Sequence, residues 1–350
     1  MLVTNSKAAE VPLAPTQPAE SQFAWKQIVE PVEPFLKAVA EKLGDQILAF
    51  DPEIRPYAQY ALTNQGKHLR PALVALSAGT IGKPGHQHVT VAVIIEMVHL
   101  ATLVHDDVMD EAEIRRRRPT LAANWGDEIS VLLGDCLFAH ALKLAASFPT
   151  PEICRVVASA TNVVCSGEIL QTHRRLNFEF TRAEYFKVLG MKTAELFALS
   201  CELGGRLSGA TDRERTALRE YGLALGTAYQ IYDDCLDLFG SEVAAGKSLG
   251  TDLASGKLTL PVLVILERAN TEEKARLKEL IQHWRPHHHQ RVLELADKYG
   301  ALQESKKVIQ QYLDASLKWL SELPATDSGA ALSGFSRFLA GQTNALGVPE

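Results

Sequence analysis

Apolar side chains recur at helical spacing along most of the chain. Apolar positions three and four residues apart indicate helices that bury one face. The pattern predicts helices over residues 25–49, 71–81, 89–112, 129–147, 151–171, 182–207, 211–239 and 260–269. No stretch alternates apolar and polar side chains convincingly, as paired strands would. The expected fold class is therefore all-α.

Two of these segments are apolar almost throughout, residues 89–104 and 221–232. A helix that is apolar on all sides is surrounded by other helices. We therefore expect a bundle of long helices around a central apolar cavity. Residues 1–21 are rich in Ala, Pro, Ser and Thr, which predicts a flexible N-terminal extension. No Pro-rich or Ser-rich linker follows, so residues 22–350 are expected to form a single domain.

The composition narrows the class of protein. Hydrophobic residues make up 46% and charged residues 22% of the 350, and the net charge is −6, which argues against a general nucleic-acid binder. The five cysteines are dispersed without metal-ligand spacing, so a reducing, cytoplasmic location is expected. No secretory signal and no run of about 18 uncharged apolar residues stands out, which predicts no membrane-spanning segment.

The pattern D-D-x-x-D occurs twice, each time at the C-terminal end of a strongly apolar predicted helix. The two trios are Asp106, Asp107 and Asp110, and Asp233, Asp234 and Asp237. At about 100° per residue, each trio falls within one arc of a helix. Like charges at this spacing repel each other, and the negative end of the helix dipole adds to the cost. A bound cation would offset that cost, whereas the alternative is a solvated helix end.

The ligands offered are hard oxygen atoms, which favour Mg²⁺, with Mn²⁺ as a second candidate. Magnesium commonly completes its coordination shell with phosphate oxygens. The pattern therefore also predicts a phosphorylated ligand, and such a ligand requires cations from the protein.

Basic residues gather near the same predicted elements. Lys67 and Arg70 come just before a helix that begins near Pro71, where backbone N–H groups attract anions. His99 lies two turns before the first trio on the same face, although a hydrogen-bonded core histidine is an alternative. A run of four arginines, residues 115–118, follows that trio and could bind phosphate or form a solvated loop.

Further polar residues lie near the second trio. Lys192 and Thr193 occupy one predicted helix, and Lys247 and Lys257 bracket the segment after the trio. A lysine-bearing loop of this kind could close over a ligand and exclude water.

Taken in order, these motifs resemble those of the trans-isoprenyl diphosphate synthases. They are G-K-x-x-R-P, a histidine seven residues before the first D-D-x-x-D, two arginines after it, G-E, K-T, Q-I-x-D-D-x-x-D and G-K-x-x-G-x-D-L-x-x-G-K. The resemblance runs from about Lys26 to the C-terminus. It implies an all-α enzyme, usually a homodimer, that joins an allylic diphosphate to isopentenyl diphosphate head to tail.

The same resemblance implies a role for each site residue. All six aspartates would hold Mg²⁺, and the catalytic group would be Asp106, Asp107, Asp110, Lys192 and Asp233. Contacts to the allylic diphosphate would come from Arg115, Lys192, Gln230, Lys247 and Lys257. Isopentenyl diphosphate would bind to Lys67, Arg70, His99 and Arg116, and the reaction zone would be lined by Gln171 and Thr193. One departure is Arg117, which replaces the glycine common in the family.

The resemblance also directs attention to product length. The cavity floor in the family lies four and five residues before the first aspartate, where this chain has the small residues Thr102 and Ala101. A growing tail could pass this level toward Val98 and Met97, which predicts a product longer than farnesyl. Ala101→Phe should then shorten the product.

Other interpretations stay open on the sequence alone. A farnesyl or geranylgeranyl diphosphate synthase would share the motifs. A class I terpene cyclase would have a different second metal motif. A non-catalytic partner subunit would tend to lose its aspartates. A di-iron bundle would need paired E-x-x-H motifs.

Overall fold

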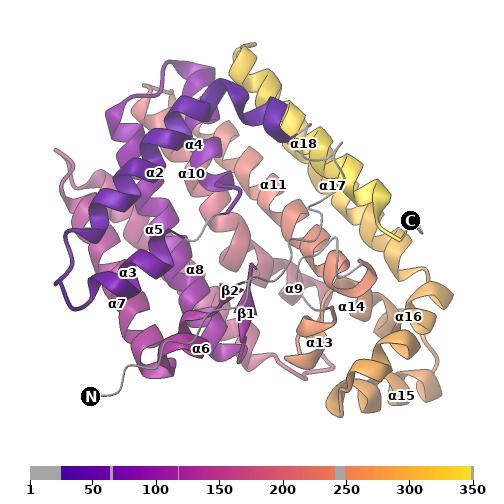
Figure 1. Cartoon of the computed structure of the whole chain (residues 1–350). Helices are drawn as coiled ribbons and strands as arrows, with labels where there is room; N and C mark the ends of the chain where they lie inside the picture. The colour runs from indigo at the N-terminus through magenta and orange to yellow at the C-terminus, as the bar shows by residue number, and fades with distance from the viewer. Residues whose placement is uncertain (1–24, 64–65, 117, 241–248, 348–350) are drawn as a thin grey trace, which may run out of the picture.

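The computed structural model describes residues 25–63, 66–116, 118–240 and 249–347. Within these ranges the chain is an all-α bundle of long helices, as expected (Figure 1). The N-terminal half contains η1 (Glu30–Val32), α2 (Glu33–Ile47), α3 (Arg55–Leu62), α4 (Leu69–Ile81), α5 (His86–Met109), β1 (Ile114–Arg115), β2 (Arg118–Pro119), α6 (Leu121–Trp125), α7 (Asp127–Ala146) and α8 (Glu152–His173).

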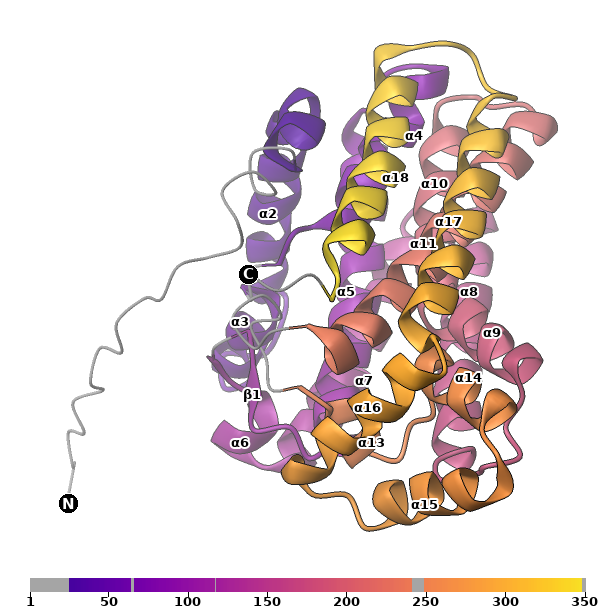
Figure 2. The ribbon, with the colours of Figure 1, turned by 90° about the vertical axis from the view of Figure 1, so that its right-hand side faces the viewer.

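The C-terminal half continues with α9 (Arg182–Leu189), η2 (Gly190–Ala194), α10 (Glu195–Leu207), α11 (Asp212–Phe239), α13 (Thr251–Ala254), α14 (Leu260–Arg268), α15 (Thr271–Gln282), η3 (Pro286–His288), α16 (His289–Lys298), α17 (Ala301–Leu320) and α18 (Asp327–Ala345). The long helices run side by side, and α13, α15 and α16 gather at one end of the bundle (Figure 2). The proposed extension, residues 1–21, lies outside the described residues. The division into that extension and a domain of residues 22–350 stays a prediction.

The two nearly all-apolar segments lie within α5 and α11, and each of these helices contributes to a hydrophobic core. The core around α5 includes residues of α2, α3, α7 and α8, whereas the core around α11 includes residues of α14, α17 and α18. Helices α4 and α10 contribute side chains to both cores. The bundle thus holds the C-terminal ends of α5 and α11, and with them both acidic motifs, within one packed unit.

Helices α10 and α11 approach each other closely because glycine stands at the contact. A Cβ atom at Gly222 would lie 2.6 Å from the Phe197 carbonyl oxygen, and one at Gly226 would lie 2.7 Å from the Cα atom of Ala194. Between α9 and α10 the chain makes a π-helical turn, η2, which is an irregularity often found at functional sites.

The sequence predicted no paired strands, and this prediction is wrong for one short segment. Strands β1 and β2 form an antiparallel pair in which Ile114 faces Pro119 and Arg115 faces Arg118. Two members of the arginine run, Arg115 and Arg118, therefore lie opposite each other, whereas Arg117 lies outside the described residues.

Three described helices, α5, α7 and α8, are long and apolar enough to cross a membrane by length and composition. The most apolar window of α5 is 72% buried inside the protein, against 39% in α7 and 28% in α8. The core therefore explains the apolarity of α5, whereas α7 and α8 leave apolar surface uncovered. Each of these helices carries charged residues, such as Glu96 in α5, so the expectation of no uncharged apolar run of about 18 residues is not contradicted.

Candidate active site

The two acidic motifs meet at one cavity of about 1340 Å³. Its walls include Asp106 and Asp110 at the end of α5, and Asp233 and Asp234 near the end of α11. The sequence-based expectation that both motifs serve one site is therefore consistent with the geometry.

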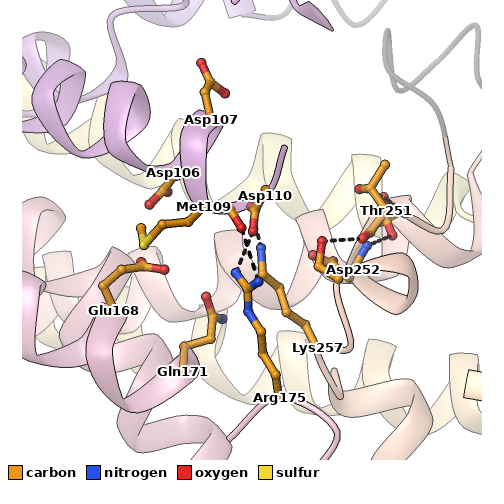
Figure 3. Close-up of polar contacts among 12 residues, drawn as sticks. Asp106, Asp107, Met109, Asp110, Glu168, Gln171, Arg175, Thr251, Asp252 and Lys257 are labelled. Carbon is orange, nitrogen blue, oxygen red and sulfur yellow. Dashed lines mark hydrogen bonds and ion pairs between the residues drawn. The ribbon is translucent and has the colours of Figure 1, made fainter. Parts of the chain in front are cut away.

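The members of the first motif have different surroundings. Asp107 points away from Asp106 and Asp110 (Figure 3). Its side chain is buried, and its Oδ1 atom accepts a hydrogen bond of 2.5 Å from Nε of Arg115. Desolvation raises the pKa of Asp107, although Arg115 opposes this shift. Asp107 is not among the residues that line the cavity, so in this structure it orients Arg115 instead of joining the other two carboxylates.

Asp106 is the least satisfied carboxylate of the first motif. Its Oδ1 atom is buried without a hydrogen-bond partner among the described residues, and its Oδ2 atom lies 3.4 Å from Nζ of Lys192. A buried carboxylate oxygen without a partner is costly, and a bound divalent cation would satisfy it.

Asp110 is held by two cations (Figure 3). Nζ of Lys257 lies 2.6 Å from Oδ2, and Nη2 of Arg175 lies 2.7 Å from Oδ1. Although desolvation acts in the opposite direction, Lys257, Lys192 and Arg175 together lower the pKa of Asp110. The two cations therefore favour the ionised form of this carboxyl and contact both of its oxygens.

The second motif is divided in a different way. Asp234 is buried and accepts hydrogen bonds from Tyr185 Oη at 2.6 Å and Gln230 Nε2 at 2.8 Å. Desolvation raises its pKa well above the usual value. Asp237 accepts from the backbone N–H and hydroxyl of Thr251 and from the backbone N–H of Asp252. Asp237 thus fixes the start of α13 and does not line the cavity.

Asp233 lines the cavity beside Asp234. Desolvation lowers the pKa of Lys67, and the charge of Asp233 partly offsets that shift. The second motif therefore approaches the basic segment before α4.

The π-helical turn η2 places Lys192 and Thr193 between the two motifs. Nζ of Lys192 lies 2.5 Å from Glu168 Oε2 and donates to Gln171 Oε1 at 2.9 Å. Desolvation acts to lower the pKa of Lys192, but Asp106 and Glu168 outweigh it and raise that pKa. The Thr193 hydroxyl donates to Gln230 Oε1 at 2.8 Å, which extends the polar chain to Asp234.

A basic region lies on the other side of the same cavity, lined by Lys67, Arg70, His99 and Arg116. The Arg70 guanidinium stacks over the Phe197 ring at 5.1 Å, and its Nε has no partner among the described residues. Desolvation, followed by the charges of Arg70, Arg116 and Arg115, lowers the pKa of His99 well below its usual value. His99 is therefore a neutral residue at this site.

The fit of Arg116 depends on a glycine. A Cβ atom at Gly66 would lie 2.5 Å from Nη1 of Arg116, so a larger residue at this position would displace the guanidinium. This arrangement joins the β1–β2 turn to the segment before α4 and brings its arginine into the basic region.

Three charged residues at the site had no role assigned from the sequence: Glu96, Glu168 and Arg175. Glu96 is buried in α5 and lies 3.6 Å from Nδ1 of His68, where its charge raises the pKa of Arg70 against desolvation. A single carboxylate within an apolar helix, three residues before His99, was the available signal. Arg175 gave no such signal, because its partner Asp110 lies 65 residues earlier. Lys247 lies outside the described residues.

No group of three His, Cys, Asp or Glu side chains within the described ranges is close enough to hold a metal by itself. Asp106, Asp110 and Asp233 nevertheless offer hard oxygen ligands from two sides of the cavity. This donor set fits Mg²⁺, which binds through one or two carboxylates together with substrate phosphates.

The cavity wall also includes uncharged residues of three helices. They are Thr102 and Leu103 of α5, Phe138 of α7 and Val164 of α8. Ala101, Val98 and Met97 are buried and do not line it in this structure, so their role as a floor stays a prediction. Phe138 is an aromatic residue of this wall, and the sequence argument, confined to the helix of the first motif, missed it.

Comparisons with known proteins define the class to which this fold and site belong. Residues 51–299 match the family model for polyprenyl synthetase. Octaprenyl diphosphate synthase of Escherichia coli (strain K12) is 34% identical over 300 residues, which cover 85% of this chain and 92% of that protein.

Solved structures agree with this assignment. A decaprenyl diphosphate synthase from Rhodobacter capsulatus superposes with a TM-score of 0.85 at 31% identity and covers 91% of this chain and 99% of its own. A polyprenyl synthase from Caulobacter crescentus CB15, complexed with calcium and isoprenyl diphosphate, has a TM-score of 0.83 at 31% identity and covers 91% and 97%. The chain belongs to the polyprenyl synthetase family. It is an enzyme of the prenyltransferase class, as the motifs indicated.

Proposed function

We propose that this enzyme condenses an allylic diphosphate with isopentenyl diphosphate head to tail, in a reaction that depends on Mg²⁺ or Mn²⁺. The observation that carries the proposal is the placement of Asp106, Asp110 and Asp233, from two distant helices, on one cavity that also contains two separate groups of cations. One group surrounds the acidic motifs, and the other surrounds His99.

The allylic diphosphate is assigned to the acidic side of the cavity. Asp106, Asp110 and Asp233 would hold Mg²⁺, which supplies positive charge to the departing diphosphate. Lys192 and Lys257 add fixed positive charge on the same side, which stabilises negative charge as the carbon–oxygen bond breaks. Arg115 is oriented by its hydrogen bond to Asp107. Among the arginines of residues 115–118, it is therefore the one assigned to the allylic diphosphate.

Isopentenyl diphosphate is assigned to Lys67, Arg70, His99 and Arg116. His99 is neutral, so it hydrogen-bonds to the anion without adding charge, and the two arginines supply the charge. Thr193 Oγ1 and Gln171 Oε1 lie at the cavity wall between the two assigned regions. Their dipoles stabilise the allylic carbocation that the double bond of isopentenyl diphosphate attacks, and the released diphosphate then removes the proton.

Incubation with labelled isopentenyl diphosphate tests this function. Farnesyl diphosphate and Mg²⁺ should yield extended prenyl diphosphates, and omission of the metal should abolish the product. Conversion of the allylic substrate alone into a hydrocarbon, without incorporation of the label, would contradict the proposal and support a terpene cyclase.

We propose a product longer than farnesyl, because the relatives named above make octaprenyl and decaprenyl diphosphates and the cavity passes the small residue Thr102. Phe138 is proposed as the residue that limits further extension. Thr102→Phe should shorten the main product, and Phe138→Ala should lengthen it. Chromatography of the dephosphorylated products measures both, and unchanged lengths would remove these two residues from the floor.

We propose that the enzyme is a homodimer that uses the uncovered faces of α7 and α8. Leu132 and Val131 of α7 are 60% and 42% exposed, and Ile169 of α8 is 68% exposed. Paired apolar surface of this kind is typical of an interface between subunits. Light scattering should give twice the chain mass, and Leu132→Asp should shift it toward the monomer.

We further propose a cytoplasmic location without a membrane-spanning segment. All five cysteines are free, as expected in a reducing compartment. Recovery in the soluble fraction without detergent would support this location, and recovery only with membranes would contradict it.

A further inference from the structure

Asp110 is a cavity carboxylate that contacts two cations. Both of its oxygens are paired, Oδ2 with Lys257 Nζ at 2.6 Å and Oδ1 with Arg175 Nη2 at 2.7 Å (Figure 3). One negative charge is therefore shared by two positive charges. The family resemblance gives Lys257 a role at the allylic diphosphate, whereas neither the resemblance nor the proposed mechanism requires Arg175.

Hydrogen bonds with the backbone hold Arg175 beside Asp110. Its Nη1 atom donates to the Met109 carbonyl oxygen at 3.3 Å, at the C-terminal end of α5, where the helix dipole favours a cation. Its own N–H donates to the Thr172 carbonyl oxygen at the end of α8. The guanidinium thus bridges the ends of two helices beside the first acidic motif.

The segments that carry the two cations are also tied to each other. The Leu176 N–H donates to the Gly256 carbonyl oxygen at 2.8 Å, next to both Arg175 and Lys257. A Cβ atom at Gly256, where φ is +71°, would lie 2.9 Å from Cγ of Leu176. Because both contacts are close, the cations are held beside Asp110 together.

We propose that Arg175 is a positioning residue whose positive charge neutralises Asp110 when no metal is bound. It thereby sets the divalent-cation concentration at which the metal site forms. In the metal-free enzyme its positive charge stabilises the ionised carboxylate. A divalent ion on the same carboxylate repels the guanidinium, so the pair favours the metal-free state more than the loaded state. The inference rests on the proposed function, in which Asp110 is a metal ligand.

The test is direct measurement of Mn²⁺ binding to the full-length protein in the presence of inorganic diphosphate, by electron paramagnetic resonance of free Mn²⁺. Arg175→Gln should bind Mn²⁺ roughly fivefold more tightly than the wild type, which corresponds to about 1 kcal/mol. Its melting temperature without metal should fall, and the increase on adding Mn²⁺ should be larger. Arg175→Lys, which keeps the charge, should remain within about twofold of the wild type.

Arg174→Gln is the matched control, because it removes the same charge one residue away. Arg174 pairs with Glu184 at 2.8 Å and not with Asp110. Its Mn²⁺ affinity should stay within about twofold of the wild type. Unchanged or weaker Mn²⁺ binding by Arg175→Gln, or an equal gain in the control, would overturn the role of Arg175. No Mn²⁺ binding by the wild type would instead overturn the proposed metal site.

A second measurement does not depend on the folding of a variant. In wild-type crystals with Mn²⁺ and inorganic diphosphate bound, Nη2 of Arg175 should have moved beyond about 3.6 Å from Oδ1 of Asp110. A metal on Asp110 with the Arg175 hydrogen bond intact would overturn the proposal.

Discussion

Helices α5 and α11 end in the same D-D-x-x-D sequence, yet the structure uses the two motifs differently. On α5, Asp106 and Asp110 face the cavity and Asp107 orients Arg115. On α11, Asp233 and Asp234 line the cavity, Asp234 accepts hydrogen bonds there, and Asp237 instead accepts from the start of α13.

The difference arises from what surrounds each helix end. The end of α5 is met by Lys192, Lys257 and Arg175, which are cations from three other segments. The end of α11 is met by hydroxyl and backbone N–H donors from Tyr185 and the start of α13. Identical motifs therefore supply the same charges, but neighbouring segments decide which of those charges remain available to a metal.

The largest expected effect concerns Asp106 and Asp233, one cavity carboxylate from each motif. Asp106→Asn or Asp233→Asn should lower kcat by on the order of 1000-fold, equivalent to about 4 kcal/mol of transition-state stabilisation. Steady-state kinetics with saturating Mg²⁺ measures the loss. Asp314→Asn, at an exposed position on α17, serves as the control and should leave kcat unchanged.

The next effect is on stability. Asp237→Asn should lower the free energy of unfolding by about 2–4 kcal/mol, because a buried carboxylate that accepts from Thr251 and Asp252 is lost. Urea denaturation of the metal-free protein measures the change. A loss below about 0.5 kcal/mol would show that the second motif does not fix α13.

A smaller effect is the pH dependence of stability that arises from His99 in the basic region of the cavity. The folded-state pKa of His99 lies well below the unfolded value, so its contribution to stability is present above about pH 6.5 and is lost as the pH falls below it. Between pH 7.5 and 5.5 the wild type should lose about 1.4 kcal/mol more than His99→Gln. Equal losses in the two proteins would mean that His99 is protonated in the folded state.

The smallest effect concerns one hydrogen bond of the second motif. Tyr185→Phe should lower the free energy of unfolding by about 1 kcal/mol, since Asp234 loses one donor but keeps Gln230. Turnover should change much less than in Asp233→Asn. A loss of turnover as large as in that variant would place Asp234 among the groups that act directly on the substrate.

Much of the fold could be predicted because helical periodicity is a local property. Helices α4, α7 and α11 begin and end within two residues of the expected limits. The short strands at Ile114–Arg115 and Arg118–Pro119 were missed because two residues per strand give no alternating pattern. Likewise, the length and apolarity of α7 and α8 do not reveal which face is covered.

The sequence predicted which residues belong to the site, but it did not predict how their side chains are arranged. Spacing placed three carboxylates on one arc of each helix, yet side-chain direction separates Asp107 from its neighbours by its contact with Arg115. Arg175 and Phe138 could not be found from the motifs, because each acts through a partner or a cavity wall distant in sequence.

The most direct test of the different roles of these aspartates is a crystal structure with Mn²⁺ and an unreactive allylic diphosphate analogue. Anomalous scattering would locate the metals. The account predicts metal peaks within coordination distance of Asp106, Asp110 and Asp233, with Asp107 still on Arg115 and Asp237 still on Thr251. A metal coordinated by Asp107 or Asp237, or no metal between the two helix ends, would contradict it.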